Sequence, residues 1–184
     1  WEVYGPMEAE DTMEPAFDWE RTDDSLALLN HGLPVWRFQY ADELEKPFFD
    51  PVALLDGRNL VWNAPPDHPW HHALWFSWKY INGINYWEES RETGKAAGRT
   101  TWSNVSVIAE EDLSAQISMD LAYAPSGKAP VLTEKREITV SSPEEDGTYR
   151  LDWTLAFTAR AERVELNRTP IPGEKGGRAN GGYA

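Results

Sequence analysis

The sequence predicts an all-β fold, a sandwich of two antiparallel sheets, and two observations carry this prediction. Apolar and polar residues alternate with a period of two along several stretches, as they do in strands that bury one face, whereas the helical period of about 3.6 residues is almost absent. Glycine, proline, aspartate and asparagine separate these stretches. Many short strands joined by short polar turns are typical of a sandwich.

In the first half of the chain, a strand is expected over residues 35–40, with its aromatic face buried. Asp56-Gly57 lies between apolar runs and predicts a hairpin, because glycine tolerates a positive φ. Residues 71–80 carry apolar side chains on both faces, which favours a central strand covered on both sides. The only helix expected is a turn or two in the acidic leader, residues 7–19.

In the second half, residues 113–123 and 149–157 alternate as half-buried strands do, and residues 132–140 alternate in the same way. Polar, glycine- and proline-containing stretches at 124–130 and 141–147 are expected to be loops. None of these loops is long enough to mark a boundary between domains.

Length and composition limit the classes of protein to consider. A chain of 184 residues suits a single domain, which we expect to span residues 1–184. A net charge of -14 disfavours nucleic acid and anionic membrane surfaces as partners, and no apolar run is long enough to cross a bilayer. The absence of cysteine excludes disulfides and thiolate metal sites. The location stays open, with a periplasmic or secreted protein favoured.

The two ends of the sequence suggest that it is part of a longer protein. The chain begins at Trp1 without an initiator methionine and stops in the glycine-rich stretch GGRANGGYA. We therefore expect an incomplete sandwich that is the N-terminal portion of a larger domain. Either the longer chain was cleaved near Ala184, or a second chain carries the rest of the fold.

The stretch PPDHPWHHALWF, residues 65–76, holds three of the four histidines. Its prolines restrict the backbone, so Asp67 and His68 are expected in a stiff loop. Histidine serves as a general acid or base near neutral pH, and an adjacent aspartate can fix its tautomer. This chemistry predicts catalytic roles for His68 and His72, with Asp67 as their orienting group and His71 as a substrate-binding residue. The alternative is that Asp67 caps the turn and the histidines bond backbone groups.

A metal site is a weaker alternative, and no cofactor is expected. His71 and His72 are adjacent, so on an extended chain they point to opposite faces and do not readily share an ion. The stretch lacks a third ligand close in sequence, although Glu134 or a distant carboxylate could complete a two-histidine, one-carboxylate set.

The stretch LTEKREITV, residues 132–140, places Glu134 and Arg136 on the apolar face of a strand. A charge on that face is costly unless it is paired or faces a wet groove. In the functional interpretation, Glu134 is a second catalytic acid or base and Arg136 binds an anionic or hydroxyl-rich substrate. In the structural interpretation, the two form an ion pair that bridges to a neighbouring strand, or they lie at a solvated strand end.

Five of the ten tryptophans lie between residues 62 and 87. Large aromatic side chains dominate cores, so several of them are expected to be structural. A tryptophan left exposed in a cleft would offer a flat face to the C–H surface of a sugar ring, while short polar side chains would bond the hydroxyls. Trp78, Asn82 and Asn85 are therefore expected to bind substrate.

The segments KPFFDPV, PPDHPWHHALWFSWKYINGINYWEE, TEKREITV and GGYA together resemble the PmoA-like proteins, which carry the label methane oxygenase. The resemblance covers most of the chain from about Lys46 onward. It implies a β-supersandwich similar to galactose-mutarotase-like domains, a longer chain, and an association with sugar-catabolic genes. The label itself fits poorly, because particulate methane oxidation takes place in a membrane protein. The family's usual Arg-Gly after the paired histidines is Ala73-Leu74 here, so no anion-binding role is implied at that position.

Three hypotheses about function follow. The first is a carbohydrate-active enzyme of the glycoside hydrolase or lyase type, working by histidine and carboxylate acid–base catalysis in a concave cleft. The second is a noncatalytic carbohydrate-binding module. The third is a metal-dependent oxidoreductase. The enzyme hypothesis requires that Asp67, His68, His72, Glu134 and Arg136 meet in one pocket.

Overall fold

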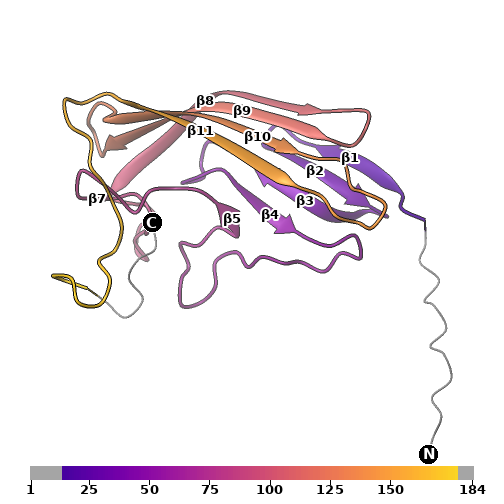
Figure 1. The fold of residues 1–184 in the computed structure, drawn as a ribbon, viewed down its shortest axis with the longest axis horizontal. Coiled ribbons are helices and arrows are strands. Elements are labelled where there is room, and N and C mark those ends of the chain that lie inside the picture. The colour runs from indigo at the N-terminus through magenta and orange to yellow at the C-terminus, as the bar shows by residue number, and fades with distance from the viewer. Residues whose placement is uncertain (1–13, 178–184) are drawn as a thin grey trace, which may run out of the picture.

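The fold is an antiparallel β-sandwich, described for residues 14–177 by a computed structural model (Figure 1). One sheet has five strands in chain order: β1 (Phe17–Arg21), β2 (Ser25–Asn30), β3 (Leu33–Gln39), β4 (Phe48–Val52) and β5 (Leu74–Trp75). The second sheet has the order β11-β10-β9-β8, with β8 (Gly98–Ala109), β9 (Ala115–Pro125), β10 (Leu132–Val140) and β11 (Leu151–Ala159). A small third sheet, in the order β12-β6-β7, contains β6 (Tyr80–Ile81), β7 (Ile84–Asn85) and β12 (Leu166–Asn167).

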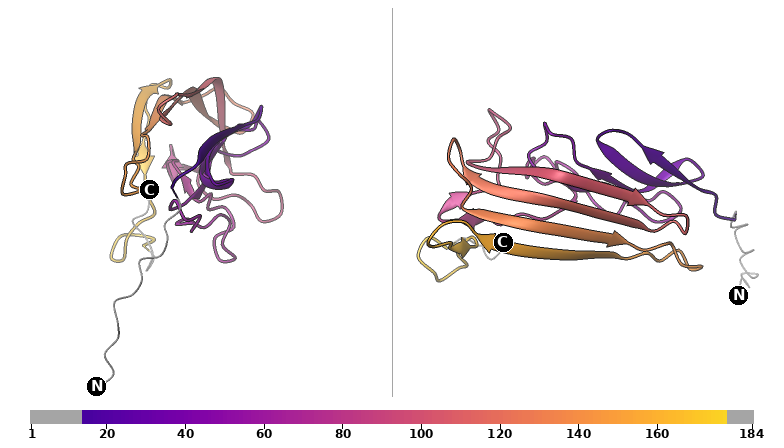
Figure 2. Two further views of the ribbon diagram at one scale, coloured as in Figure 1. Left: turned by 90° about the vertical axis from the view of Figure 1, so that its right-hand side faces the viewer. Right: turned by 90° about the horizontal axis from the view of Figure 1, so that it is seen from above.

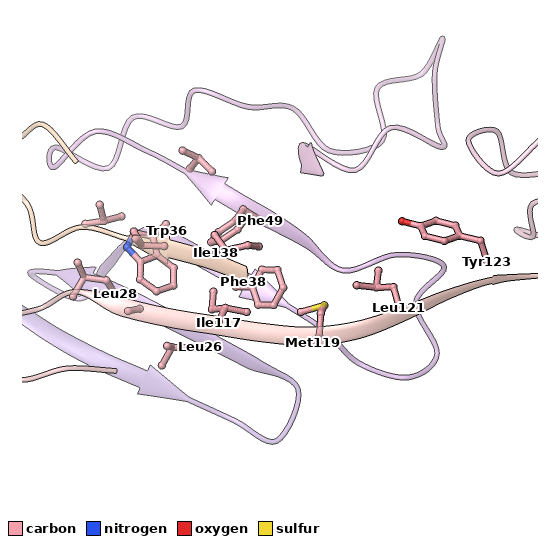
Figure 3. Close-up of a cluster of buried hydrophobic side chains, with 14 of the residues drawn as sticks. Leu26, Leu28, Trp36, Phe38, Phe49, Ile117, Met119, Leu121, Tyr123 and Ile138 are labelled. Carbon is pink, nitrogen blue, oxygen red and sulfur yellow. The ribbon is translucent and has the colours of Figure 1, made fainter. Parts of the chain in front are cut away.

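The two larger sheets lie face to face as separate layers (Figures 1 and 2). The core fills the space between them. Trp36 and Phe38 of β3 and Phe49 of β4 pack with Ile117 of β9 and Ile138 of β10 (Figure 3). All five side chains are buried, so each sheet has one apolar face that is removed from water by the other.

The alternation predicted for the long strands is confirmed. In β9 the side chains of Ala115, Ile117, Met119, Leu121 and Tyr123 are all buried, and the residues between them are exposed or half-buried. Strand β10 shows the same period over residues 132–140, and β11 repeats it more weakly because its inward residues are only half-buried. The loop expected at 141–147 is observed, and the loop expected at 124–130 begins after Pro125, because Ala124 and Pro125 still belong to β9.

The prediction of a central strand over residues 71–80 is wrong. Apart from Tyr80, the first residue of β6, only Leu74–Trp75 is a strand there, and it forms the edge of the five-stranded sheet, next to β4. Ala73 has a φ of 52°, which interrupts the extended backbone just before β5. The small residue Ser77 and the cation of Lys79 are buried, whereas Phe76 and Trp78 are half-buried. The apolar residues on both faces therefore belong to an irregular segment packed by its aromatic rings and not to a strand covered on both sides.

Two smaller predictions are also corrected. Asp56-Gly57 does form a tight turn, in which Gly57 has a φ of 83° and donates its N–H to Leu54 O at 2.9 Å, but an isolated bridge and not a pair of strands flanks it. The helix expected over residues 7–19 lies partly outside the described residues, and its described end belongs to β1. Between residues 14 and 177 no helix is long and apolar enough to cross a membrane.

Candidate functional site

The loop that contains Asp67 and His68 is closed by backbone hydrogen bonds. His68 N–H donates to Pro65 O and His71 N–H donates to His68 O, both at 2.9 Å, which makes two consecutive turns. At the base of the loop, Ala64 N–H donates to His71 O at 2.7 Å. These bonds add to the restriction that the prolines impose on the backbone of the loop.

Within this loop, His68 and Asp67 form a pair on the protein surface. His68 Nδ1 lies 2.8 Å from Asp67 Oδ2, and this hydrogen bond from His68 lowers the pKa of the Asp67 carboxyl. An ionised carboxylate accepts from Nδ1–H, which leaves Nε2 of a neutral imidazole as the free base. The His68 side chain is half-exposed, and its ring meets the edge of Trp70. The pair thus has the geometry of an oriented general base.

His72 belongs to a different, largely buried group. Its Nε2 lies 2.7 Å from Glu89 Oε1, and Lys46 Nζ lies 2.7 Å from the same oxygen. The Lys46 side chain is 1% exposed and lies over the ring of Trp75. His72 also packs against the rings of Phe48 and Trp75. We refer to Lys46, His72 and Glu89 as the Glu89 cluster.

The electrostatics of the Glu89 cluster favour a paired state. Burial lowers the pKa of Lys46, and the negative charge of Glu89 only partly offsets this effect. Burial also acts to raise the pKa of Glu89, but the hydrogen bonds and charges of His72 and Lys46 outweigh it, so the pKa of Glu89 is lowered. Glu89 therefore stays ionised and holds both neighbours in place.

His71, expected to bind substrate, packs its ring against the edge of Trp75. Burial, followed by the positive charges of His72 and His68, lowers the pKa of His71. The neutral imidazole is thus favoured at this position at neutral pH.

Glu134 and Arg136 form the ion pair that the structural interpretation anticipated. Arg136 Nε donates to Glu134 Oε1 at 2.5 Å and Nη2 donates to Oε2 at 3.0 Å, while the hydroxyl of Tyr123 donates to the same carboxylate. Glu134 is 2% exposed and Arg136 is 0% exposed. The guanidinium lies against the rings of Phe76 and Trp153. Burial raises the pKa of Tyr123 well above its usual value, so its hydroxyl stays a donor.

The five residues that the enzyme hypothesis requires in one pocket are held in three separate local groups. His68 is bonded to Asp67, His72 to Glu89, and Arg136 to Glu134, so each charge has its own local partner. The adjacent rings of Trp75 and Phe76 contact the Glu89 cluster and Arg136 respectively. Each of these two groups is thus packed against an aromatic ring.

The two asparagines expected to bind substrate are engaged in local structure. Asn82 Oδ1 accepts from Glu165 N–H at 2.7 Å, and its amide donates to Arg163 O at 3.2 Å. Asn85 Oδ1 accepts from Trp87 N–H at 2.8 Å, and its amide donates to Glu88 at 2.8 Å. Both side chains therefore hold the chain around the small third sheet.

Trp78 lines a groove of about 770 Å³, formed around the small third sheet, whose strand β7 lies at the end of the molecule opposite β1 and β2 (Figure 1). The aromatic rings of Trp78 and Tyr80 meet polar side chains there, and we call this the Trp78 groove. Its lining consists of Trp78, Tyr80, Gly83, Leu166, Asn167, Arg168, Pro170 and Glu174. The indole N–H of Trp78 is buried without a hydrogen-bond partner among the described residues. Its volume lies within the range of about 300 to 1,000 Å³ that is usual for small-molecule sites.

Arg168 and Glu174 form a bidentate ion pair in this groove. Nη2 lies 2.9 Å from Oε1 and Nη1 lies 3.1 Å from Oε2. Glu174 Oε2 also accepts from Ile171 N–H at 3.0 Å. The bond from Arg168 lowers the pKa of Glu174, and the bond to Glu174 raises the pKa of Arg168, so both stay charged.

No metal-binding arrangement is found in the described part of the chain. Over residues 14–177, no three histidine, aspartate or glutamate side chains are grouped so as to hold an ion. Glu134, the proposed third ligand, is already bonded to Arg136 and Tyr123.

These features define an antiparallel β-sandwich with an exposed Asp–His pair, a buried glutamate cluster and an aromatic groove. The chain belongs to the family described as Family of unknown function (DUF6807), which matches residues 25–184. Neither a search of curated proteins nor a search of solved structures found a match.

The sequence reasoning missed most of the groove and two of the three members of the Glu89 cluster, Lys46 and Glu89. Asn167 ends the short strand β12, and Arg168 and Glu174 follow it in a segment where the sequence shows no ligand-binding motif. Lys46 precedes an apolar Pro-Phe-Phe run, and a lone lysine beside such a run is a signal for a buried ion pair. Its partner Glu89 lies 43 residues away, and no local pattern indicates that distance.

Proposed function

We propose that this protein acts on a carbohydrate, which it binds in the Trp78 groove. The observation that carries the proposal is the composition of the groove, where the rings of Trp78 and Tyr80 adjoin the amide of Asn167 and the Arg168–Glu174 pair. Aromatic faces suit the C–H surface of a pyranose ring, and amide, guanidinium and carboxylate groups suit its hydroxyls. The resemblance to the PmoA-like proteins, with its implied link to sugar catabolism, supports the same class of ligand.

In the proposed enzyme, of the glycoside hydrolase or lyase type, the Asp67–His68 pair transfers the proton, although neither residue lines the groove itself. His68 is the histidine whose ring is half-exposed and oriented by a carboxylate. His72 acts as a positioning residue through Glu89. The Glu134–Arg136 pair has a structural role in β10, where Arg136 packs against the rings of Phe76 and Trp153. A noncatalytic binding module is the second candidate, because the groove has a complete set of ligand-binding groups without the Asp67–His68 pair.

Two matched substitutions test the binding and the catalytic parts separately. Binding is measured on a glycan array and by calorimetry for the wild type, Trp78→Ala and Trp62→Ala. Trp62 is a suitable control because it is 67% exposed and lies outside the groove. We expect binding to fall at least about tenfold in Trp78→Ala and to be unchanged in Trp62→Ala. Equal binding by all three proteins would refute the groove as the carbohydrate site.

Turnover is measured on the glycans that bind, by the release of reducing ends and by the ultraviolet absorbance of unsaturated products. We expect His68→Asn to lower the rate by about 100-fold or more, and His31→Asn to leave it unchanged. His31 is the matched control because it is an exposed histidine in the turn between β2 and β3. Turnover that His68→Asn does not change would refute the catalytic role, and binding without any product would identify a binding module.

A further inference from the structure

The described lining of the Trp78 groove contains one cation and one anion, and each neutralises the other. Among the lining residues within 14–177, Arg168 is the only positively charged side chain and Glu174 the only negatively charged one. Both nitrogens of the guanidinium fork are bonded to the two carboxylate oxygens, at 2.9 and 3.1 Å. Nη1 also donates to Thr169 O at 3.2 Å. A ligand that enters the groove therefore meets a paired guanidinium and not a free one.

The unpaired groups in the groove are neutral. The indole N–H of Trp78 is buried and has no partner among the described residues, and Asn167 lines the groove with a neutral amide. The amide can donate to and accept from the hydroxyls of a sugar. Neither provides the charge that a desolvated carboxylate requires.

From these contacts we infer that the Trp78 groove takes a neutral sugar and discriminates against a uronic acid, an inference that rests on the carbohydrate function proposed above. A uronate carboxylate would have to displace Glu174 from Arg168, which exchanges one carboxylate for another and leaves Glu174 unpaired. The net charge of -14 adds a long-range repulsion against polyanionic glycans, because the whole protein carries the same sign of charge.

This preference decides between the two reaction types that the proposed function leaves open. Elimination removes the C5 proton of a uronic acid to a base and breaks the C4–O bond, so that a C4–C5 double bond forms, the leaving oxygen takes up a proton as a hydroxyl, and no water is consumed. That step requires the carboxylate at C5 and a cation to hold it. Hydrolysis breaks the C1–O bond, transfers a proton to the leaving oxygen and adds the hydroxide of water to C1. A groove that excludes uronates therefore accommodates hydrolysis and not elimination.

The experiment compares matched pairs of sugars on matched variants. Calorimetry is performed at physiological ionic strength with the methyl glycosides of glucose, galactose and mannose and with the corresponding uronides. Groove binding is defined as binding that Trp78→Ala removes. The test variant is Glu174→Gln, which frees Arg168. The control is Glu165→Gln, because Glu165 pairs with Arg163 on the surface and does not line the groove.

We expect the wild type to bind at least one neutral glycoside at least about tenfold more tightly than its uronide. In Glu174→Gln the uronide should gain about tenfold or more in affinity, and in Glu165→Gln neither sugar should change. A wild type that binds a uronide as tightly as its neutral partner would overturn the inference and leave the carbohydrate function standing. If Trp78→Ala removes no binding to any of these sugars, the inference and the proposed function both fail.

Discussion

Replacing Glu89 by glutamine should destabilise the protein by about 3 kcal/mol at neutral pH. The substitution keeps the shape of the side chain but removes the charge that neutralises Lys46, whose side chain is 1% exposed and whose Nζ lies 2.7 Å from Glu89 Oε1. Removing one partner of a buried ion pair typically costs about 3 to 5 kcal/mol, because the other charge stays buried and unpaired. Glutamine still accepts one hydrogen bond, so we expect the lower end of this range. For a chain of this size the melting temperature falls by about 6 to 12 °C.

The assay is urea and thermal unfolding followed by circular dichroism, with Glu137→Gln as the matched control. Glu137 pairs with Lys135 at 3.1 Å, and both side chains are more than half exposed. An exposed pair contributes about 0 to 1 kcal/mol, so the control should unfold almost as the wild type does. The double variant Lys46→Met with Glu89→Gln should recover most of the loss. Equal stabilities of Glu89→Gln and Glu137→Gln would show that the cluster is not buried as described.

The pH dependence of the same variant provides an independent check. Burial already lowers the pKa of Lys46, and loss of Glu89 lowers it further, so the folded state releases this proton at a lower pH than the unfolded state. Wherever the unfolded state binds more protons, stability rises with pH. The deficit of Glu89→Gln should therefore shrink as pH rises from 7 toward the ordinary lysine pKa. A deficit that stays constant over that interval would contradict the assignment.

Two further predictions concern the sheet of β8 to β11 and its contacts. Arg136→Leu should lower the free energy of unfolding by about 3 to 5 kcal/mol, because the carboxylate of Glu134 stays buried without a counter-charge. The control Lys135→Met, on the outward face of β10, should lower it by less than about 1 kcal/mol. Equal losses of stability in urea unfolding would refute the burial of the pair. Burial raises the pKa of Tyr86 to about 12 and that of Tyr149 to about 12, so an ultraviolet titration at about pH 11 should find both phenols protonated. Because these pKa values are raised in the folded state, their contribution to stability is fully present below the unfolded tyrosine pKa and is lost as pH rises toward 12. Ionisation of all tyrosines near pH 10 in the folded protein would contradict this prediction.

The strands that the sequence predicts well are those with one buried face. In β9 and β10 the period of two follows directly from burial of alternate residues against the opposite sheet. The pairing of Glu134 with Arg136 was also within reach, because residues two apart on a strand share a face and two opposite charges on an apolar face must neutralise each other. These features depend on short-range sequence relations alone.

The segment from His72 to Trp87 could not be predicted in the same way. Aromatic residues occupy both faces, so the pattern does not distinguish a covered strand from an irregular segment packed by its rings. The contacts that organise it are long-range: Lys46 reaches Glu89 across 43 residues, and Asn82 reaches the chain at Glu165 across 83. Pairings at such separations leave no periodic signal in a single sequence.

The adjacent residues Glu88 and Glu89 explain how an irregular segment can still form a defined groove. Strands β5, β6 and β7 have two residues each, so their ladders supply few hydrogen bonds. Glu89 binds Lys46 and His72 on one side, and Glu88 binds Lys79, immediately before Tyr80 of the groove. Charge pairs thus replace ladder hydrogen bonds in fixing Trp78 and Tyr80.

Since the pKa of Glu89 is lowered in the folded state, the contribution of Glu89 to stability is fully present above the ordinary carboxyl pKa and is lost as pH falls through the lowered value. The groove should therefore keep its shape at neutral pH and lose it on strong acidification, when Glu89 takes up a proton and no longer neutralises Lys46.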